Sequence, residues 1–238
     1  MITSSTISRA ALTTFAAVIN LSDTNFIKPS EHVFVCGGTG SGKSVLADVF
    51  TAGMPETVIK IDIKDDTFAR RKNKEPLWRG LVENEDFEVV YSLEAVKKSE
   101  FKKIIYVPPF TEQEPEAYDD LARYCYNQGD TRLWIDELML FTESAVKYPP
   151  FLKAILVSGR SRNSTVLVCT QRPMGIPAIC IANSQHFFVF RMNNEQDRKK
   201  MADVTGCRKF LEPPRKYCFW YYREGADAES VRQWKLKL

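Results

Sequence analysis

Apolar residues along the chain follow two spacings in turn, and these predict strands alternating with helices. Short apolar or β-branched runs predict strands over residues 32–36, 57–63, 87–91, 103–107, 133–135, 165–169, 186–192, 217–222 and 231–236. Helical spacing of apolar residues predicts helices over residues 44–50, 112–128, 147–162, 176–182 and 195–204. The alternation is typical of an α/β domain, in which a mostly parallel sheet carries helices on both faces.

Two stretches depart from this alternation. The last two apolar runs flank Glu224 and Gly225, and they predict a closing C-terminal β-hairpin. The stretch from Arg70 to Asp86 begins with a basic cluster and continues with polar residues, so it predicts neither a strand nor a helix. It lies between the second and third predicted strands.

Length and composition limit the possible classes of protein. A chain of 238 residues, 44% of them hydrophobic, can bury one α/β core and has little left for a second domain. Its six cysteines are scattered without a C-x-x-C pair and it has two histidines, so neither a zinc site nor a disulfide framework is expected. Cysteines in apolar runs suit a reducing compartment. A net charge of +3 permits nucleic-acid binding without arguing for it.

The N-terminal segment differs from the rest of the chain. Residues 1–30 contain three charged side chains and many Ser and Thr residues, with an apolar stretch from Ala10 to Leu21. We interpret them as an arm that packs on the core or on a neighbour, followed by a single α/β domain over residues 31–238. A signal peptide is not expected, because a single Arg9 precedes the stretch and no cleavage pattern follows it. No apolar run reaches the 18 residues of a membrane-spanning helix.

A complete G-x-x-x-x-G-K-[ST] motif stands between the first predicted strand and the first predicted helix. Its glycines let backbone N–H groups converge on phosphate oxygens, its lysine reaches the β- and γ-phosphates, and its serine hydroxyl binds Mg²⁺. The motif therefore predicts binding of a nucleoside triphosphate. The predicted binding residues are Gly37, Gly38, Thr39, Gly40, Ser41, Gly42, Lys43, Ser44 and Val45.

A second motif follows the apolar run 133–135, where Asp136 and Glu137 are adjacent. In loop-type NTPases, such an aspartate supports Mg²⁺ and the next glutamate polarises the attacking water. The alternative for such a pair, considered alone, is a helix cap after a strand. With the loop upstream, we predict that Asp136 supports the metal and that Glu137 is the general base. Kinases and GTPases usually lack this glutamate, and the chain has no N-K-x-D motif for guanine, so ATP hydrolysis coupled to motion is favoured.

A third segment combines a polar amide with arginines. Gln171 ends the strand over 165–169, where its amide can contact phosphate or water, although an ordinary turn before Pro173 is the alternative. Arg160 and Arg162 end the preceding helix, where cations also serve a structural role. We predict that Arg160 completes the site of a neighbouring subunit as an arginine finger, with Arg162 as the second choice.

Together these residues resemble the FtsK–HerA superfamily of ring-forming DNA-pumping ATPases, and most of all its genome-packaging ATPases from membrane-containing double-stranded DNA viruses. The matching stretches are 37–44, 59–64, 133–137, 159–173, 187–191 and 212–215. The resemblance implies one RecA-like domain of the additional-strand, catalytic-Glu class. It places Arg160 at the trans-acting finger and Gln171 at the sensor. Asp62 and Lys64 match an Asp-x-Lys whose role in the fold or in subunit contact stays open.

The resemblance also implies cofactors, partners and a place in the cell. It implies ATP and Mg²⁺ as cofactors, a homo-oligomeric, hexameric ring, double-stranded DNA bound without sequence preference, and capsid vertex or portal-like proteins. It implies a location at the packaging vertex of the virion and in the host cytoplasm. The candidate DNA contacts, for which a solvated surface is the alternative, are Arg70, Arg71, Lys72, Lys74, Arg198, Lys199 and Lys200.

Three other functions compete with genome packaging. A cellular or plasmid DNA pump of the same superfamily differs little in sequence. A filamentous-phage-type morphogenesis ATPase is expected to carry a transmembrane helix after the motor, and a non-hydrolysing nucleotide-binding module would not need Glu137.

A late aromatic cluster at Tyr217 and residues 219–222 could stack on DNA bases, but at strand spacing it favours packing.

Overall fold

A computed structural model describes residues 27–227 and 231–235, so the predicted arm falls almost wholly outside the described residues. Nine strands of this part form one sheet in the order β3-β4-β2-β5-β6-β1-β7-β8-β9. All neighbours pair in parallel except β8 with β7 and β9 with β8, which are antiparallel. The strands are β1 Val33–Cys36, β2 Thr57–Ile61, β3 Glu88–Val90, β4 Lys103–Tyr106, β5 Thr131–Ile135, β6 Ser164–Thr170, β7 His186–Phe190, β8 Cys218–Arg223 and β9 Arg232–Lys235.

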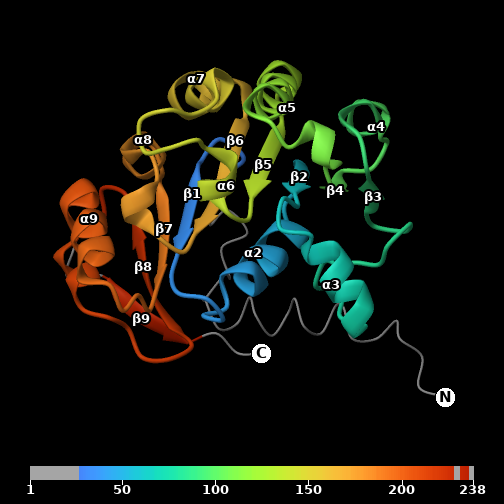
Figure 1. The fold of residues 1–238 in the computed structure, drawn as a ribbon. Coiled ribbons are helices and arrows are strands. Elements are labelled where there is room, and N and C mark those ends of the chain that lie inside the picture. The colour runs from blue at the N-terminus through green and yellow to red at the C-terminus, as the bar shows by residue number, and fades with distance from the viewer. Residues whose placement is uncertain (1–26, 228–230, 236–238) are drawn as a thin grey trace.

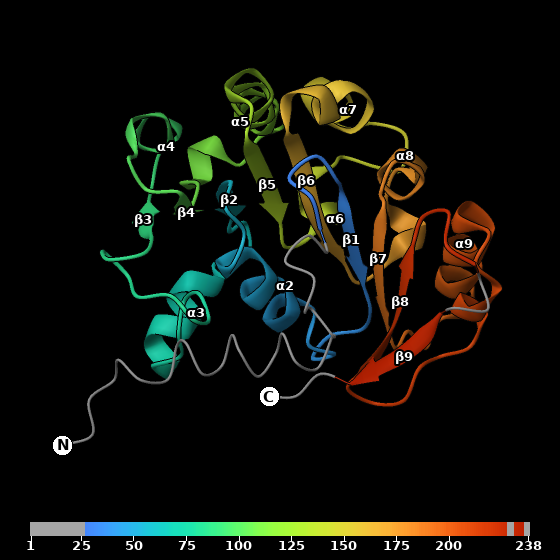
Figure 2. The same ribbon diagram turned by 180° about the vertical axis from the view of Figure 1, so that it is seen from behind.

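Helices cover both faces of the sheet, as the alternation predicted. Figures 1 and 2 show α5 and α7 together on one side of the strands and α2 with α3 on the other. The α-helices are α2 Lys43–Ala52, α3 Asp66–Asn73, α4 Leu93–Lys98, α5 Pro115–Gln128, α6 Leu138–Phe141, α7 Pro150–Ser158, α8 Ala178–Ala182 and α9 Glu195–Thr205. Short 3₁₀ turns are η1 Phe110–Glu112, η2 Gly159–Arg162, η3 Pro173–Gly175 and η4 Arg208–Leu211.

Strand β1 lies inside the sheet and contributes side chains to the hydrophobic cores on both faces of the sheet. Phe34 and Cys36 belong to the core shared with α5, α7 and α8, whereas Val33 and Val35 belong to the core shared with α2. Successive side chains of a strand point to opposite faces, so an unbroken apolar run is what a strand covered on both sides requires. The Gly37–Ser44 loop therefore starts from a rigid, fully buried element.

The register of the sheet brings the ends of four strands to one edge. Cys36 pairs with Thr170, Ile135 pairs with Val168, and Ile61 pairs with Ile135. The residues that follow β1, β2, β5 and β6 are thus neighbours across the carboxyl edge of the sheet, where ligands of parallel α/β sheets bind.

The segment from Arg70 to Asp86 is more ordered than its composition predicts. Helix α3 ends within it, and Leu77 and Trp78 are buried under the sheet. Helices α4 and α6 were also not predicted, because six and four residues are too few to show a helical period. The predicted helix over 147–162 is shorter, beginning at Pro150 and ending at Ser158 before the turn η2.

The closing hairpin is present as β8 and β9, and most of the late aromatic cluster packs on the sheet. Phe219 is fully buried, Trp220 donates its indole N–H to the Glu212 carbonyl, and Tyr222 stacks on Phe187. These contacts confirm packing for this part of the cluster. Tyr217, just before β8, is exposed instead.

Arg132, at the start of β5, ties the first described residues to the core. Its side chain is fully buried; Nε donates to Oε1 of Glu56 at 2.8 Å and Nη1 donates to the carbonyl of Glu31 at 2.7 Å. Its other nitrogen donates to the Lys28 carbonyl at 3.1 Å. The boundary predicted at residue 30 stays a prediction.

The structure also bears on the compositional expectations. All six cysteines are free and buried, as expected for thiols in apolar runs. Among the described helices none has the length and apolar character needed to cross a membrane.

Candidate active site

The Gly37–Ser44 loop closes around its own lysine. Lys43, the first residue of α2, donates from Nζ to the carbonyls of Gly37 at 2.9 Å and Gly38 at 3.1 Å. Burial lowers the pKa of this ammonium group, and the negative charge of Asp136 partly opposes the effect. The loop is anchored on both sides, because Gly37 N–H donates to the Thr170 carbonyl at the end of β6 and Gly38 N–H donates to the Arg191 carbonyl after β7.

Gly37 is needed at the start of the loop for a steric reason. It has φ +154°, and a Cβ built on it would overlap the Cβ of Phe190 on the neighbouring strand β7. Only glycine allows the loop to leave β1 this close to β7. The motif therefore has glycine here because of packing as well as phosphate approach.

Ser44, Asp136 and Lys64 meet at the carboxyl edge of the sheet. Ser44 Oγ donates to Asp136 Oδ1 at 2.9 Å, and Lys64 Nζ lies 2.5 Å from Asp136 Oδ2. The Asp136 side chain is 5% exposed and burial alone would raise the pKa of its carboxyl group, but the Lys64 and Lys60 ammonium groups hold that pKa below its usual value. The carboxylate is therefore charged and already held by a cation.

This oxygen pair fits a magnesium ion. A serine hydroxyl and one carboxylate, side by side, are the few protein ligands that Mg²⁺ takes when it keeps waters and binds phosphate oxygens. The Lys64 ammonium acts as a stand-in cation at the same carboxylate. The described ranges contain no cluster of three or more His, Cys, Asp or Glu residues that could hold a metal ion.

Glu137 follows Asp136 directly, two residues after β5 ends at Ile135, and is the N-cap residue of α6. Its side chain is nearly buried, and Oε1 has no hydrogen-bond partner among the described residues. A buried carboxylate oxygen without a partner is costly unless a ligand or water satisfies it. The position suits a base that waits for water, which the alternative of a helix cap does not explain, since Glu137 makes no side-chain cap bond.

Gln171 lies against the phosphate-binding loop, as its predicted role requires. Its Oε1 accepts a hydrogen bond from Thr39 Oγ1 at 2.6 Å. The next residue fixes the turn, because Arg172 Nε donates to Oδ2 of the buried Asp197 at 3.1 Å and the Met174 N–H donates to Oδ1 at 2.9 Å. The Gln171 amide thus lies on a turn between β6 and η3 that hydrogen bonds to Asp197 fix in place.

Arg160 lies at the opposite end of β6. It is exposed in η2, and its carbonyl accepts from Asn163 N–H, immediately before the first residue of the strand. Gly159 allows this tight turn, since a Cβ there would overlap the Ser164 carbonyl oxygen. Arg162 is exposed too, but its guanidinium lies 5.0 Å from the ring centre of Tyr126. Neither arginine is near the loop of its own chain.

The seven candidate DNA contacts have different surroundings. Arg70 is 11% exposed and pairs with Asp48 at 2.8 Å and Asp66 at 2.6 Å, which favours a structural role. Arg198 and Lys200 donate to backbone carbonyls of neighbouring turns and are only partly exposed.

The other four basic residues are exposed. Arg71 is held by Glu83 at 2.5 Å and by the Tyr91 hydroxyl at 2.9 Å. Lys72 and Lys74 lie at the end of α3, and Lys199 lies on α9. These exposed side chains are the ones that a DNA backbone could reach.

The structure assigns two roles that the sequence left open. Asp62 accepts hydrogen bonds from the backbone N–H groups of Asp66 at 2.9 Å and Thr67 at 2.6 Å, so it caps the first turn of α3. Lys64 instead points to Asp136. The sequence shows the Asp-x-Lys spacing, but only the pairing of β2 with β5 brings Lys64 to Asp136.

Comparisons with known proteins bear on the fold. No protein-family model matches the chain. The chain is 24% identical over 108 residues to the DNA packaging ATPase P9 of Enterobacteria phage PRD1, a match that covers 42% of this chain and 46% of that protein. The match thus spans less than half the length of this curated relative.

Solved structures match over more of the chain. The genome packaging NTPase B204 from Sulfolobus turreted icosahedral virus 2, in complex with ATP-gammaS, has a TM-score of 0.67 at 15% identity, over 89% of this chain and 100% of that one. The pCW3 conjugation coupling protein TcpA has a TM-score of 0.53 at 16% identity, over 87% of this chain and 60% of that one. This likeness shows the fold, a P-loop NTPase domain, and confirms the expected fold class.

Proposed function

We propose that this chain is an ATP-hydrolysing motor that moves double-stranded DNA into the capsid of a virus, acting as a ring of identical subunits. The observation that carries the proposal is the meeting, at one sheet edge, of the Lys43 loop, the Ser44–Asp136 pair, Gln171, and Glu137, whose Oε1 has no partner in the described part of the chain. The similarity to a phage DNA packaging ATPase and to a viral genome packaging NTPase supports the cargo and the setting.

The proposed chemistry assigns one task to each side chain. The loop N–H groups and Lys43 hold the β- and γ-phosphates, while Ser44 and Asp136 hold Mg²⁺, which would neutralise phosphate charge. Glu137 accepts a proton from the water that attacks the γ-phosphorus, and the bond from the γ-phosphorus to the bridging oxygen of ADP breaks. Gln171 contacts the γ-phosphate or the water and, through the turn held by Asp197, transmits the change to η3 and α9.

The proposed ring supplies the remaining charge and the grip on DNA. Arg160 of one subunit stabilises the transition state in the site of its neighbour. Exposed lysines and arginines, namely Arg71, Lys72, Lys74 and Lys199, contact DNA phosphates without reading sequence. Capsid vertex proteins dock the ring, which acts at the packaging vertex of the virion assembled in the host cytoplasm.

A plasmid DNA pump is the alternative, since the conjugation coupling protein TcpA shares the fold. Packaging is preferred because the curated sequence match is to a packaging ATPase and the structural match to the viral NTPase is the stronger of the two.

The experiment is the ATPase rate of the wild type and of Glu137→Gln, each with and without double-stranded DNA. We expect the wild type to be stimulated by DNA. We expect Glu137→Gln to bind ATP normally and to hydrolyse it about 10²–10⁴ times more slowly, because the general base is lost. A wild-type rate that DNA leaves unchanged contradicts the motor. An unchanged rate in Glu137→Gln contradicts the assignment of the base.

A further inference from the structure

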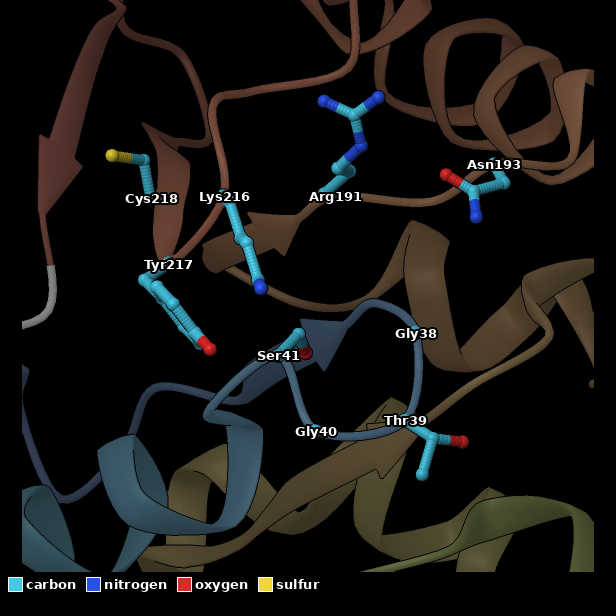
Figure 3. A pocket seen from close by; sticks show the side chains of 9 residues that line it. All are labelled: Gly38, Thr39, Gly40, Ser41, Arg191, Asn193, Lys216, Tyr217 and Cys218. Atoms are coloured by element: carbon cyan, nitrogen blue, oxygen red, sulfur yellow. The ribbon is translucent and has the colours of Figure 1, made fainter.

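A cavity of about 410 Å³ opens beside the phosphate-binding loop, and neither Asp136 nor Glu137 lines it. The loop residues 38–41 form one wall, and Arg191 with the segment 216–218 before β8 forms the other. Figure 3 shows the side chains of Lys216 and Tyr217 extending toward the loop at Gly40 and Ser41, while the Arg191 guanidinium points away from it. The volume lies within the range of small-molecule sites.

The sheet order shows which part of a nucleotide this cavity faces. Strand β1, which leads into the loop, lies between β6 and β7, and β5 with its Asp136 lies beyond β6. Strand β8 lies on the opposite side, beyond β7. A triphosphate with its γ-phosphate directed to Asp136 therefore carries its ribose and base toward β7 and β8, where the cavity is.

Two residues that line the cavity, Ser41 and Tyr217, have features that indicate a ligand. Ser41 Oγ is buried and has no hydrogen-bond partner within residues 27–227 and 231–235. Tyr217 has φ +59° and is 45% exposed, whereas other tyrosines of the same strand region pack on the sheet. A bulky aromatic residue rarely adopts this backbone conformation, and such strain clusters at ligand sites.

The ring of Tyr217 is available as a flat surface. The Lys216 ammonium group makes a cation–π contact with this ring, 5.0 Å from its centre. Both side chains come from the loop before β8. Strand β8 begins beside the end of β7, because Phe219 pairs with Phe190. The ring is thus held at the same sheet edge as the phosphate-binding loop.

We propose that Tyr217 is the stacking platform for the nucleobase of the triphosphate that the Gly37–Ser44 loop holds. The proposal rests on the proposed nucleotide binding and adds the part of the site that recognises the base. Stacking accepts any base with a π face, so purine nucleotides bind with similar strength and their affinity depends on the ring of Tyr217. Lys216 is displaced from the ring when the base arrives.

The test compares nucleotides with a ligand that lacks a base. Isothermal titration calorimetry measures binding of ATPγS, GTPγS and inorganic tripolyphosphate, with Mg²⁺, to the full chain. The variant is Tyr217→Asn, because asparagine removes the ring and tolerates positive φ, so folding is retained. Tyr217→Phe restores the ring without the hydroxyl. Tyr91→Asn is the matched control, since Tyr91 is a similarly exposed tyrosine outside the cavity.

We expect Tyr217→Asn to weaken both nucleotides by about 5- to 100-fold and to leave tripolyphosphate unchanged. Tyr217→Phe and Tyr91→Asn should bind like the wild type. Unchanged nucleotide affinity in Tyr217→Asn overturns the stacking role while nucleotide binding stands. An equal loss for tripolyphosphate also overturns it, because Tyr217 would then shape the phosphate loop. A wild type that binds neither nucleotides nor tripolyphosphate overturns the nucleotide site itself.

Discussion

Replacing Arg160 by alanine separates a residue that serves its own site from one that serves a neighbour. Arg160 and the loop lie at opposite ends of β6, since Asn163 before the strand contacts Arg160 and Thr170 at its end contacts Gly37. Six residue steps from Ser164 to Thr170, at about 3.3 Å each, put them about 20 Å apart. An arginine cannot cross that distance within its own subunit, so any catalytic contact must be made across an interface.

The expected effect is large on hydrolysis and small on binding. An arginine finger supplied by a neighbouring subunit raises the rate of hydrolysis by about 10³–10⁵-fold. Arg160→Ala should therefore reduce the ATP turnover rate by about the same factor, while its affinity for ATPγS stays within about twofold of the wild-type value. Arg162→Ala is the control, because the Arg162 guanidinium rests on Tyr126 and should not be needed.

The decisive assay mixes two inactive variants. Arg160→Ala keeps an intact loop, and Lys43→Ala keeps an intact finger. In a ring whose subunits mix at random in equal amounts, about one site in four combines an intact loop with a neighbour's Arg160, so about a quarter of the wild-type rate should return. One variant carries an affinity tag, so that native mass spectrometry shows whether the rings are mixed. No recovery in mixed rings refutes the trans role. Loss and recovery in Arg162→Ala instead would move the finger to Arg162.

Three further predictions follow from particular contacts. Lys64→Met leaves the buried Asp136 carboxylate without its nearest cation, so the free energy of unfolding of the ligand-free protein should fall by about 1.5–3 kcal/mol in calorimetry. The loss should disappear when Mg²⁺ and ATPγS are bound, and an equal loss with and without these ligands would contradict the prediction. Burial lowers the pKa of His32 to about 3, below the unfolded value of 6.5, so the unfolded chain binds the proton first and the free energy of unfolding should fall by about 2 kcal/mol from pH 7 to pH 5. His32→Asn should remove that part of the fall in urea titrations, and an unchanged pH profile would count against it. Gly37→Ala should abolish ATPγS binding while the circular dichroism spectrum is kept, because the new methyl group overlaps Phe190; normal affinity would show that the loop can yield.

The sequence predicted the central parts of the fold because they repeat a strong pattern. Strands β1, β2, β5, β6 and β7 are fully or almost fully buried. An unbroken apolar run such as residues 166–169 is typical of a strand that is covered on both faces of the sheet. The loop and the Asp136–Glu137 pair were found because their chemistry needs fixed residue types at fixed positions after a strand.

Other features depend on contacts between distant segments. Helix α3 has a low apolar content and is held by Asp62, Asp48 and Arg70, none of which forms a periodic signal. The pairing of Lys64 with Asp136 depends on the register of β2 with β5, which spacing along the chain does not reveal. The position of Tyr217 beside the loop likewise follows from the antiparallel pairing of β8 with β7, 180 residues after the motif began.

Displacement of a third DNA strand tests the proposed motor most directly. A linear duplex carrying a labelled triplex-forming oligonucleotide is incubated with the protein, Mg²⁺ and ATP, and release of the label is followed in time. The account predicts ATP-dependent release by the wild type, with no release by Glu137→Gln or with ATPγS in place of ATP. Wild-type protein that hydrolyses ATP on this DNA while the third strand stays bound would contradict translocation.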